Sequence, residues 1–276
     1  MLSFPVNYNA LMVTEILRPA TVQEALKAGA MPGSAYLGGG TWLNAAPSAE
    51  PLILISLEKL ALDSIQATEK ACFLGATATL QKVIDDPRVS AVLRNAAALT
   101  ASRTLRNMMT IGGEVALHPA DSALIPLLVA MGAEISVAGK KKPIPIDGWL
   151  LQTGGGLVLS VSIPAPARPC AVLAVSRTSH SPRSLVVAAC AHTLLPRISG
   201  LSVLACDCRG TMVRLAALEK SLEGRPLPSR EEVEKSVGEG FSPLADMHAS
   251  SPYKLYMTRV LAADALLMMA GGKAGQ

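Results

Sequence analysis

The apolar positions in the first third of the chain alternate between strand-like runs and a helical stretch. Thr21, followed three residues later by Glu24, opens the segment TVQEALKAGA (21–30), and this pair predicts a capped helix. The run SAYLGGG (34–40) predicts a strand that enters a glycine turn, and PLILISL (51–57) predicts a second buried strand. The order of these elements predicts a β-α-β-like N-terminal unit.

The middle of the chain repeats this mixture of strands and helices. We expect a third strand over 70–79, a helix over 79–87 and a longer helix over 88–102. A second glycine turn is expected at Gly112 and Gly113, where two glycines interrupt apolar residues. Asp121 or Ser122 is then expected to cap a helix that ends near Gly132. Further strands, including a hairpin, are expected over 133–139, 142–150 and 155–166.

The Pro-rich segment IPAPARP (163–169) predicts a boundary, because the pattern changes after it. Strands are expected over 170–178, 184–194, 201–210 and 211–218, and helices over 229–241 and 251–272. Strands followed by helices are typical of an α+β unit. We therefore expect a first domain over 1–168, with subdomains of about 1–60 and 61–168, and a C-terminal α+β domain over 169–276.

The composition excludes several classes of protein. Half of the 276 residues are hydrophobic, which predicts sizeable buried cores, yet the longest apolar runs are too short for a membrane span. The first residues lack the pattern of a secretory signal, so we expect a cytoplasmic protein. A net charge of +4 from scattered Lys and Arg, with only three Phe, two Trp and four Tyr, does not indicate a nucleic-acid surface.

The cysteines and histidines predict no metal site. Four histidines are isolated from one another, and the pair Cys206 and Cys208 has no second pair to complete a zinc site. We expect all five cysteines to be buried free thiols in a reducing compartment.

The two glycine-rich segments are the clearest candidates for binding. Consecutive main-chain N–H groups without side chains can converge on phosphate oxygens, and a hydroxyl such as Thr41 or Thr110 can add a donor. The alternative is that both segments are ordinary tight turns. Neither segment matches a dinucleotide-binding or P-loop pattern, because no helix is expected directly after the glycines at 38–40.

Several motifs in their order along the chain resemble one family. They are YLGGGTWLN, LGATATLQ, TLRNMMTIGGEVA, IPLLVAMGAEISV, LVLSVSIPAP and YKLYMTRVLAADAL. This order is similar to that of the FAD-binding, medium subunit of the molybdenum hydroxylases, such as carbon monoxide dehydrogenase and xanthine dehydrogenase. The resemblance covers about residues 15–270 and implies a PCMH-type FAD-binding fold followed by a C-terminal α+β domain with an antiparallel sheet.

The resemblance also implies cofactor-binding residues. In the family, the two glycine segments wrap the FAD diphosphate through main-chain amides, and Ile111 is expected close to the flavin ring. Asp121 and Val158 complete the set of candidate residues. The full set is Leu37, Gly38, Gly39, Gly40, Thr41, Thr110, Ile111, Gly112, Gly113, Glu114, Asp121 and Val158.

This sequence departs from the family pattern at several of these positions. Glu114 replaces an asparagine, and its carboxylate would repel a diphosphate unless it points away or pairs with a cation such as Arg106. Ala123 stands where the family has Asp, and Ala174 where it often has Lys. Trp42 stands at a usually acidic position, either as a stacking surface or as a core aromatic that caps the turn.

The resemblance implies an oxidoreductase subunit with no catalytic side chain of its own and no metal ligand. Electrons would come from a molybdopterin large subunit through a two-iron two-sulfur small subunit, and FAD would pass them to an acceptor such as NAD+. One alternative is a non-catalytic assembly subunit with a degenerate flavin site, and a weaker one is a stand-alone flavin enzyme. Lys254 and Arg259 are interpreted as facing a partner or as solvated charges on the last helix.

Overall fold

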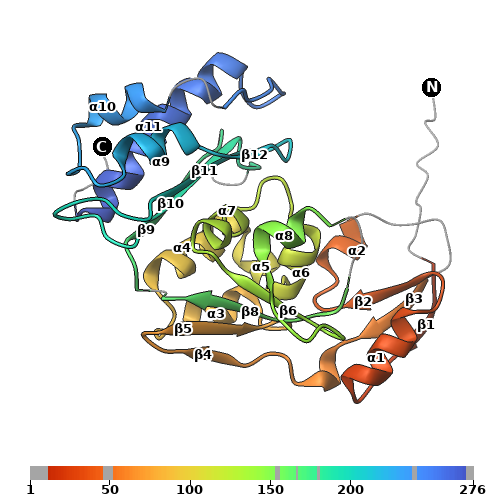
Figure 1. The fold of residues 1–276 in the computed structure, drawn as a ribbon. Helices are drawn as coiled ribbons and strands as arrows, with labels where there is room; N and C mark the ends of the chain where they lie inside the picture. Colours follow the sequence, from red (N-terminus) through yellow and green to blue (C-terminus); the bar gives the residue numbers. More distant parts are fainter. Residues whose placement is uncertain are drawn as a thin grey trace, which may run out of the picture.

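Three β-sheets follow one another along the chain and divide it into N-terminal, middle and C-terminal parts (Figure 1). The computed structural model describes residues 12–45, 52–152, 156–165, 167–178, 181–237 and 241–271. The expected boundaries near residues 60 and 168 each fall between two sheets. The mixture of parallel and antiparallel sheets with separate helices confirms the predicted α+β class.

The N-terminal sheet has the parallel order β1 (Val13–Leu17), β3 (Leu52–Ser56), β2 (Ser34–Leu37). Helix α1 (Val22–Gly29) connects β1 to β2, and the Thr21 hydroxyl accepts a hydrogen bond from the Glu24 amide at 3.2 Å, as the capping pattern predicted. The β-α-β prediction is confirmed. Strand β1 was not predicted, because most of its residues are exposed and its sequence has no buried apolar run.

The middle sheet is antiparallel, with the order β4-β5-β8-β6-β7. Its strands are β4 (Ile65–Ala67), β5 (Ala71–Gly75), β6 (Glu134–Val137), β7 (Ile144–Pro145) and β8 (Val158–Pro164). The helical elements of this part are η1 (Glu58–Leu60), α3 (Leu80–Asp85), α4 (Ala91–Thr100), α5 (Arg103–Arg106), α6 (Ile111–Leu117), α7 (Leu124–Ala130) and α8 (Ile146–Leu150).

The expected strand over 142–150 is wrong for most of its length. Only Ile144–Pro145 pairs with β6, and the chain then turns into α8. This short helix buries the Trp149 ring, whose Nε1 donates a hydrogen bond to the main-chain oxygen of Val115 at 3.1 Å. A buried indole needs such an acceptor, and a straight strand would not have brought the ring to α6.

The C-terminal sheet is antiparallel, with the order β12-β11-β10-β9. Its strands are β9 (Cys170–Val175), β10 (Leu185–Cys190), β11 (Ser202–Asp207) and β12 (Met212–Arg214), and its helices are α9 (Ala216–Leu222), α10 (Arg230–Ser236) and α11 (Ser251–Met269). The expected strand over 211–218 is wrong in its second half, which begins α9. Leu218 and Leu222 are both buried at helical spacing, and this burial favours the helix.

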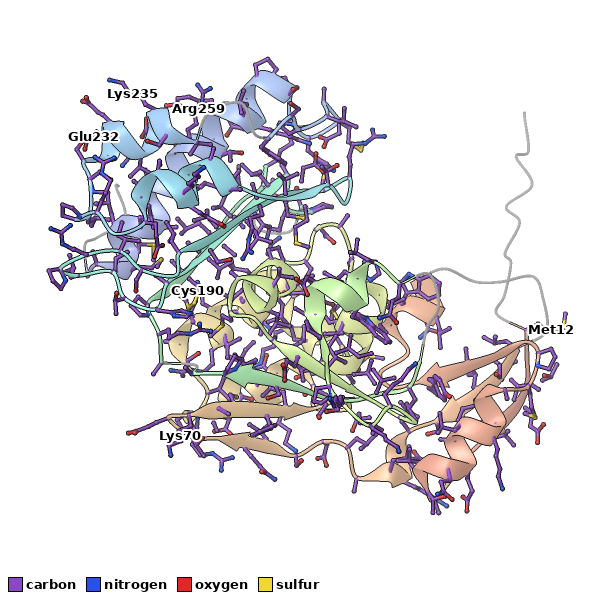
Figure 2. The ribbon with its side chains drawn as sticks, in the orientation of Figure 1. Met12, Lys70, Cys190, Glu232, Lys235 and Arg259 are labelled. Carbon is purple, nitrogen blue, oxygen red and sulfur yellow. A yellow bond between two sulfur atoms is a disulfide. The ribbon has the colours of Figure 1, made fainter. Side chains whose placement is uncertain are left out.

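The C-terminal sheet is covered on both faces. Helices α4 and α7 lie between it and the middle sheet, whereas α9, α10 and α11 lie on its other face (Figure 1). Every residue of β10 and β11 is buried as a result. Figure 2 shows Glu232, Lys235 and Arg259 on the outer helical layer, which is the side of the molecule away from the middle sheet.

The prediction that all five cysteines are free thiols is wrong for two of them. Cys170 and Cys190 form a disulfide. They are direct partners in the register of β9 and β10, which places their Cα atoms 4.1 Å apart. Cys190 lies at the end of β10, in the core that the sheet shares with the middle part (Figure 2). Sequence spacing could not show this pairing, because a strand register brings the two residues together. The other three cysteines are free.

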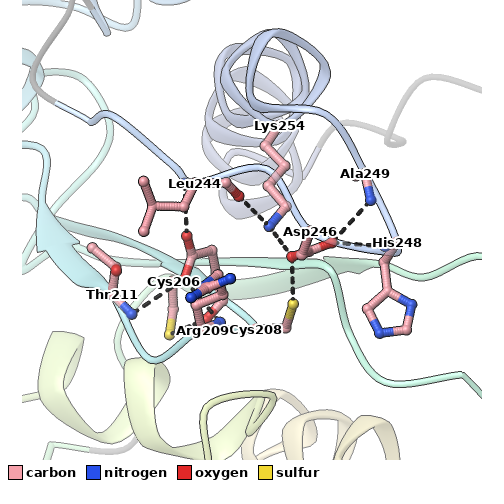
Figure 3. Close-up of polar contacts among 10 residues, drawn as sticks. Cys206, Cys208, Arg209, Thr211, Leu244, Asp246, His248, Ala249 and Lys254 are labelled. Atoms are coloured by element: carbon pink, nitrogen blue, oxygen red, sulfur yellow. Dashed lines mark hydrogen bonds and ion pairs between the residues drawn. The ribbon is translucent and has the colours of Figure 1, made fainter.

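Lys254 is neither partner-facing nor solvated, so both interpretations of this residue are wrong. Its side chain has no exposed surface, and its ammonium group forms an ion pair with Asp246 and donates a hydrogen bond to the Leu244 main-chain oxygen at 2.9 Å (Figure 3). Cys208 Sγ donates to the same Asp246 oxygen at 2.8 Å. This cluster ties the segment before α11 to the turn after β11.

Burial alone would raise the pKa of Asp246. Hydrogen bonds from Cys208 and Lys254, together with the main-chain amides of His248 and Ala249, outweigh burial and hold this pKa well below its usual range. Asp246 is therefore an ionised carboxylate that accepts hydrogen bonds from all four of these groups (Figure 3).

No helix within the described ranges is both long enough and apolar enough to cross a membrane.

Candidate functional site

Both glycine-rich segments border one cavity between the N-terminal and middle parts of the molecule. The cavity has a volume of about 540 Å³, which lies within the range typical of small-molecule and cofactor sites. Nine of the twelve candidate residues line it: Gly38, Gly39, Gly40, Thr41, Thr110, Gly112, Gly113, Glu114 and Val158. Two segments separated by about 70 residues in sequence thus meet at one site, as their resemblance implied.

The first glycine segment connects β2 to a short helix. Helix α2 (Thr41–Ala45) begins directly after Gly40, so the expectation that no helix follows the glycines is wrong. Gly40 has a φ of +69°, a conformation that few residues other than glycine adopt. A Cβ on Gly39 would lie 1.6 Å from the Met108 main-chain oxygen, so this position admits no side chain. The glycines therefore allow the first segment to lie directly against the chain before Thr110.

The first segment also presents main-chain donors. Among the residues that the structure describes, none accepts a hydrogen bond from the amides of Gly38, Gly39, Gly40 or Thr41. Four consecutive N–H groups without a partner, beside a cavity and at the start of a helix, are the donor set that binds phosphate oxygens.

The second glycine segment is the first turn of helix α6 and not a separate turn, which corrects the prediction. The Thr110 hydroxyl caps this helix by accepting a hydrogen bond from the Gly113 amide at 3.1 Å. The amides of Ile111 and Gly112 donate to the main-chain oxygens of Ala78 and Ala76, at 2.9 and 2.8 Å. The expectation that both segments offer free amides therefore holds for the first segment only.

Three candidate residues do not line the cavity. Leu37 ends β2 beside it, whereas Ile111 is fully buried in the core of the middle part. Asp121 lies in the connection between α6 and α7, but Ser122 supplies the cap, because its hydroxyl accepts from the amides of Leu124 and Ile125, each at 3.2 Å. The chain thus uses Ser122, one of the two predicted caps, and leaves Asp121 free of that role.

Glu114 is the buried carboxyl of the cavity. It is 3% exposed, and its Oε1 atom has no hydrogen-bond partner within the described part of the chain. The suggested pairing with Arg106 is wrong, because that guanidinium donates to Gln81 and to the main-chain oxygens of Ala98 and Ala101. Burial raises the pKa of Glu114 to about 7, with a further increase from Asp121, and the Ser122 hydroxyl opposes this change.

Glu114 makes the stability of the cofactor-free protein depend on pH. The folded pKa of about 7 lies above the ordinary value of 4.5, so the wild-type protein loses stability as the pH rises from about 4.5 through about 7. The full loss corresponds to about 3 kcal/mol. The Glu114→Gln variant has no such ionisation, so its free energy of unfolding should exceed that of the wild type at pH 8 by about this amount. The difference should shrink as the pH falls from about 7 and should vanish below about 4.5.

Urea unfolding at several pH values measures this difference. If the unfolding free energies of the wild type and the variant change in parallel between pH 5 and pH 8, the raised pKa assigned to Glu114 is wrong.

Trp42 is not a core aromatic. The residue is 51% exposed and lines the cavity, together with Leu105 and Leu117, which are also exposed. The Gly-rich pattern gave no signal for these two leucines or for Tyr36, because they reach the cavity from different elements and belong to no local motif. Among the described lining residues there is no Lys or Arg, and only Tyr36 and Glu114 can ionise.

The cavity fits a cofactor that carries a diphosphate and extended apolar rings. The four amides of Gly38 to Thr41, which have no partner among the described residues, supply phosphate donors without a cation. The absence of a Cβ at Gly39 lets this segment pack directly against the main chain at Met108. The apolar rim around Trp42 supplies surface for rings.

Comparisons with known proteins agree with this chemistry. Residues 11–166 match the model of a family described as the FAD binding domain in molybdopterin dehydrogenase. Over 257 residues the chain is 34% identical to the uncharacterized protein YgfM of Escherichia coli strain K12, with 92% of this chain and 95% of YgfM covered.

Solved structures show the same fold. A chain of quinoline 2-oxidoreductase from Pseudomonas putida 86 superimposes with a TM-score of 0.83 at 20% identity, covering 99% of this chain and 100% of that one. A chain of carbon monoxide dehydrogenase from Hydrogenophaga pseudoflava superimposes with a TM-score of 0.81 at 23% identity, covering 93% of this chain and 97% of that one. Because the family model matches more than half of the sequence, this chain belongs to the FAD-binding domain family of molybdopterin dehydrogenases, a family whose cofactor is FAD.

Proposed function

We propose that this chain is the FAD-binding, electron-transfer subunit of a molybdopterin-dependent hydroxylase or dehydrogenase. The observation that supports this most directly is a run of four amides, Gly38 to Thr41, that have no partner in the described part of the chain. They border a cavity of about 540 Å³ in a chain of the FAD-binding family. Bound FAD would supply the capacity to accept and release electrons, which no side chain of the cavity has.

The residues of the cavity hold the cofactor and exclude water. The amides of the first glycine segment donate to the diphosphate, and the Thr41 hydroxyl adds a donor at the same end. The Thr110 oxygen is occupied as the helix cap, which leaves its hydrogen free to donate into the cavity. Leu57, Leu157 and Val158 close the apolar side.

The partners follow from the same proposal. A flavin subunit needs a source and an acceptor of electrons, so we propose association with an iron-sulfur subunit of the two-iron two-sulfur type and a molybdopterin subunit, with an acceptor such as NAD+. The carbon monoxide dehydrogenase neighbour is described as lacking the Mo-pyranopterin moiety of its molybdenum cofactor, which is consistent with a molybdopterin partner. Purification from the native host should therefore recover the chain with iron and molybdenum, and recovery of this chain alone would contradict the partner proposal.

Titration of the cofactor-free protein with FAD tests the proposal. Trp42 lines the cavity and Trp149 is buried behind α6, so saturable binding should quench the tryptophan emission of the wild type. Because these are the only two tryptophans, Trp42→Phe should lose most of the quenching and Trp149→Phe should keep it. We expect Trp42→Ala to weaken binding by about tenfold, the equivalent of one lost aromatic contact.

A folded protein that shows no saturable change with FAD would favour the alternative, an assembly subunit with a degenerate flavin site.

A further inference from the structure

We propose that Glu114 carries its proton when FAD is bound and donates a hydrogen bond from its carboxyl group to the cofactor. This inference rests on the proposed function and adds to it a pH dependence of cofactor binding. The sequence suggested the opposite role for this residue, a carboxylate that repels the diphosphate unless a cation neutralises it.

The position of the carboxyl group supports donation into the cavity. Glu114 lies on the first turns of α6, lines the cavity and is almost entirely buried. Its Oε1 atom is out of contact with solvent and has no partner among the described residues. A buried polar atom without a partner is costly, and the missing partner could be a ligand that the Glu114 side chain reaches from its place in the cavity wall.

The other donors of α6 are already used. The amides of Ile111, Gly112 and Gly113 each bond within the protein, so this helix offers only the Thr110 hydroxyl and the Glu114 carboxyl to a ligand. A neutral carboxylic acid can donate a hydrogen bond to a phosphate or ring acceptor, whereas a carboxylate can only accept.

The charges around Glu114 favour its neutral form. Asp121 is a like charge in the connection that follows α6, and the cavity wall contains no Lys or Arg in the described part of the chain. The other titratable groups on the elements around the helix are Tyr36, which lines the same cavity, His118 at the end of α6, and Cys72 on β5, a strand that packs against α6. Burial raises the pKa of Cys72 to about 11, so this thiol stays neutral at physiological pH. Strand β8, which also packs against α6, has no titratable side chain.

The consequence is an affinity for FAD that falls as Glu114 ionises. If only the protonated form binds, the dissociation constant should rise by about tenfold for each pH unit above the pKa of Glu114. The diphosphate of FAD stays ionised throughout, so it contributes no such slope.

The experiment measures the dissociation constant of FAD for the full chain from about pH 5.5 to about pH 8.5, by flavin fluorescence and by calorimetry. The wild type should show the loss of affinity at high pH. Glu114→Gln, which is neutral and keeps a donor, should bind with a dissociation constant that changes by less than about twofold over the same range. Asp121→Asn removes the like charge and thereby lowers the pKa of Glu114, so its loss of affinity should begin at a lower pH than in the wild type.

The outcomes separate the inference from the proposed function. A wild type that binds no FAD at any pH would contradict the proposed function. A wild type that binds FAD with the same pH profile as Glu114→Gln would leave that function intact and overturn the inference. An infrared difference spectrum gives an independent measure, since a protonated carboxyl band at pH 7.5 that is present in the FAD complex and lost in Glu114→Gln would support it.

Discussion

Replacing Gly39 with alanine should weaken the binding of FAD by about 100-fold or more, which corresponds to about 3 kcal/mol or more. The added Cβ would lie 1.6 Å from the main-chain oxygen of Met108, an impossible contact with backbone that cannot rotate away. Either the first glycine segment or the chain before Thr110 must move. Because that segment presents four consecutive amides, its displacement removes several hydrogen bonds to a charged ligand together, each of about 1.5–3 kcal/mol.

The matched control for this variant is Gly148→Ala. Gly148 lies in helix α8, and a Cβ there would have no neighbour within 4 Å. Alanine is the better helix former, so this variant should bind FAD normally and gain up to about 1 kcal/mol in unfolding free energy. FAD titration and thermal unfolding of both variants measure the effects. A Gly39→Ala protein that keeps wild-type affinity would show that main-chain donors of this segment do not hold the cofactor.

Replacing Lys254 with methionine should destabilise the protein by about 3–5 kcal/mol, the effect typical of removing one partner from a buried ion pair. Lys254 is fully buried, and its ammonium group holds both the Asp246 carboxylate and the Leu244 main-chain oxygen. Methionine fills similar volume but leaves Asp246 ionised, almost buried and without its cation. The unfolding free energy from denaturant titration measures the loss.

Lys235→Met is the control, because Lys235 is an exposed residue of α10 with no ion pair among the described residues. Its unfolding free energy should stay within about 0.5 kcal/mol of the wild type. The double variant Lys254→Met, Asp246→Asn should recover part of the loss, since it removes the stranded charge. Equal stability of Lys254→Met and Lys235→Met would refute the role given to this ion pair.

Local signals in the sequence predicted much of the secondary structure. The Thr21 and Glu24 pattern located α1, and continuous apolar runs located β2, β3 and the strands of the C-terminal sheet. These elements have strong local preferences that agree with their burial. The errors lie where tertiary contacts determine the structure. Residues 146–150 form a helix that buries the Trp149 indole and brings it to its acceptor, and the register of β9 and β10 places Cys170 opposite Cys190.

The candidate site was predicted from its glycines but not from its electrostatics. The family resemblance implied that both glycine segments meet at one cofactor, and nine of the twelve candidate residues line one cavity. It did not show that the amides of the second segment are used within the protein, by the Thr110 cap and by main-chain oxygens. Nor did it show that Arg106 donates to Gln81, Ala98 and Ala101. These hydrogen bonds depend on the folded arrangement of the chain, and no local sequence motif predicts them.

Helices α4 and α7 lie between the middle and the C-terminal sheets, and this shared layer affects whether the chain can be divided into separate fragments. Apolar residues from both the middle and the C-terminal sheets belong to one continuous cluster around that layer, with Val172, Val186 and Leu204 among its members. A fragment of residues 1–168 expressed alone would expose this apolar surface to water. We expect such a fragment to aggregate unless another protein covers the surface. We therefore expect the middle and C-terminal parts to unfold together, which makes truncation at residue 168 a poor route to a minimal flavin module.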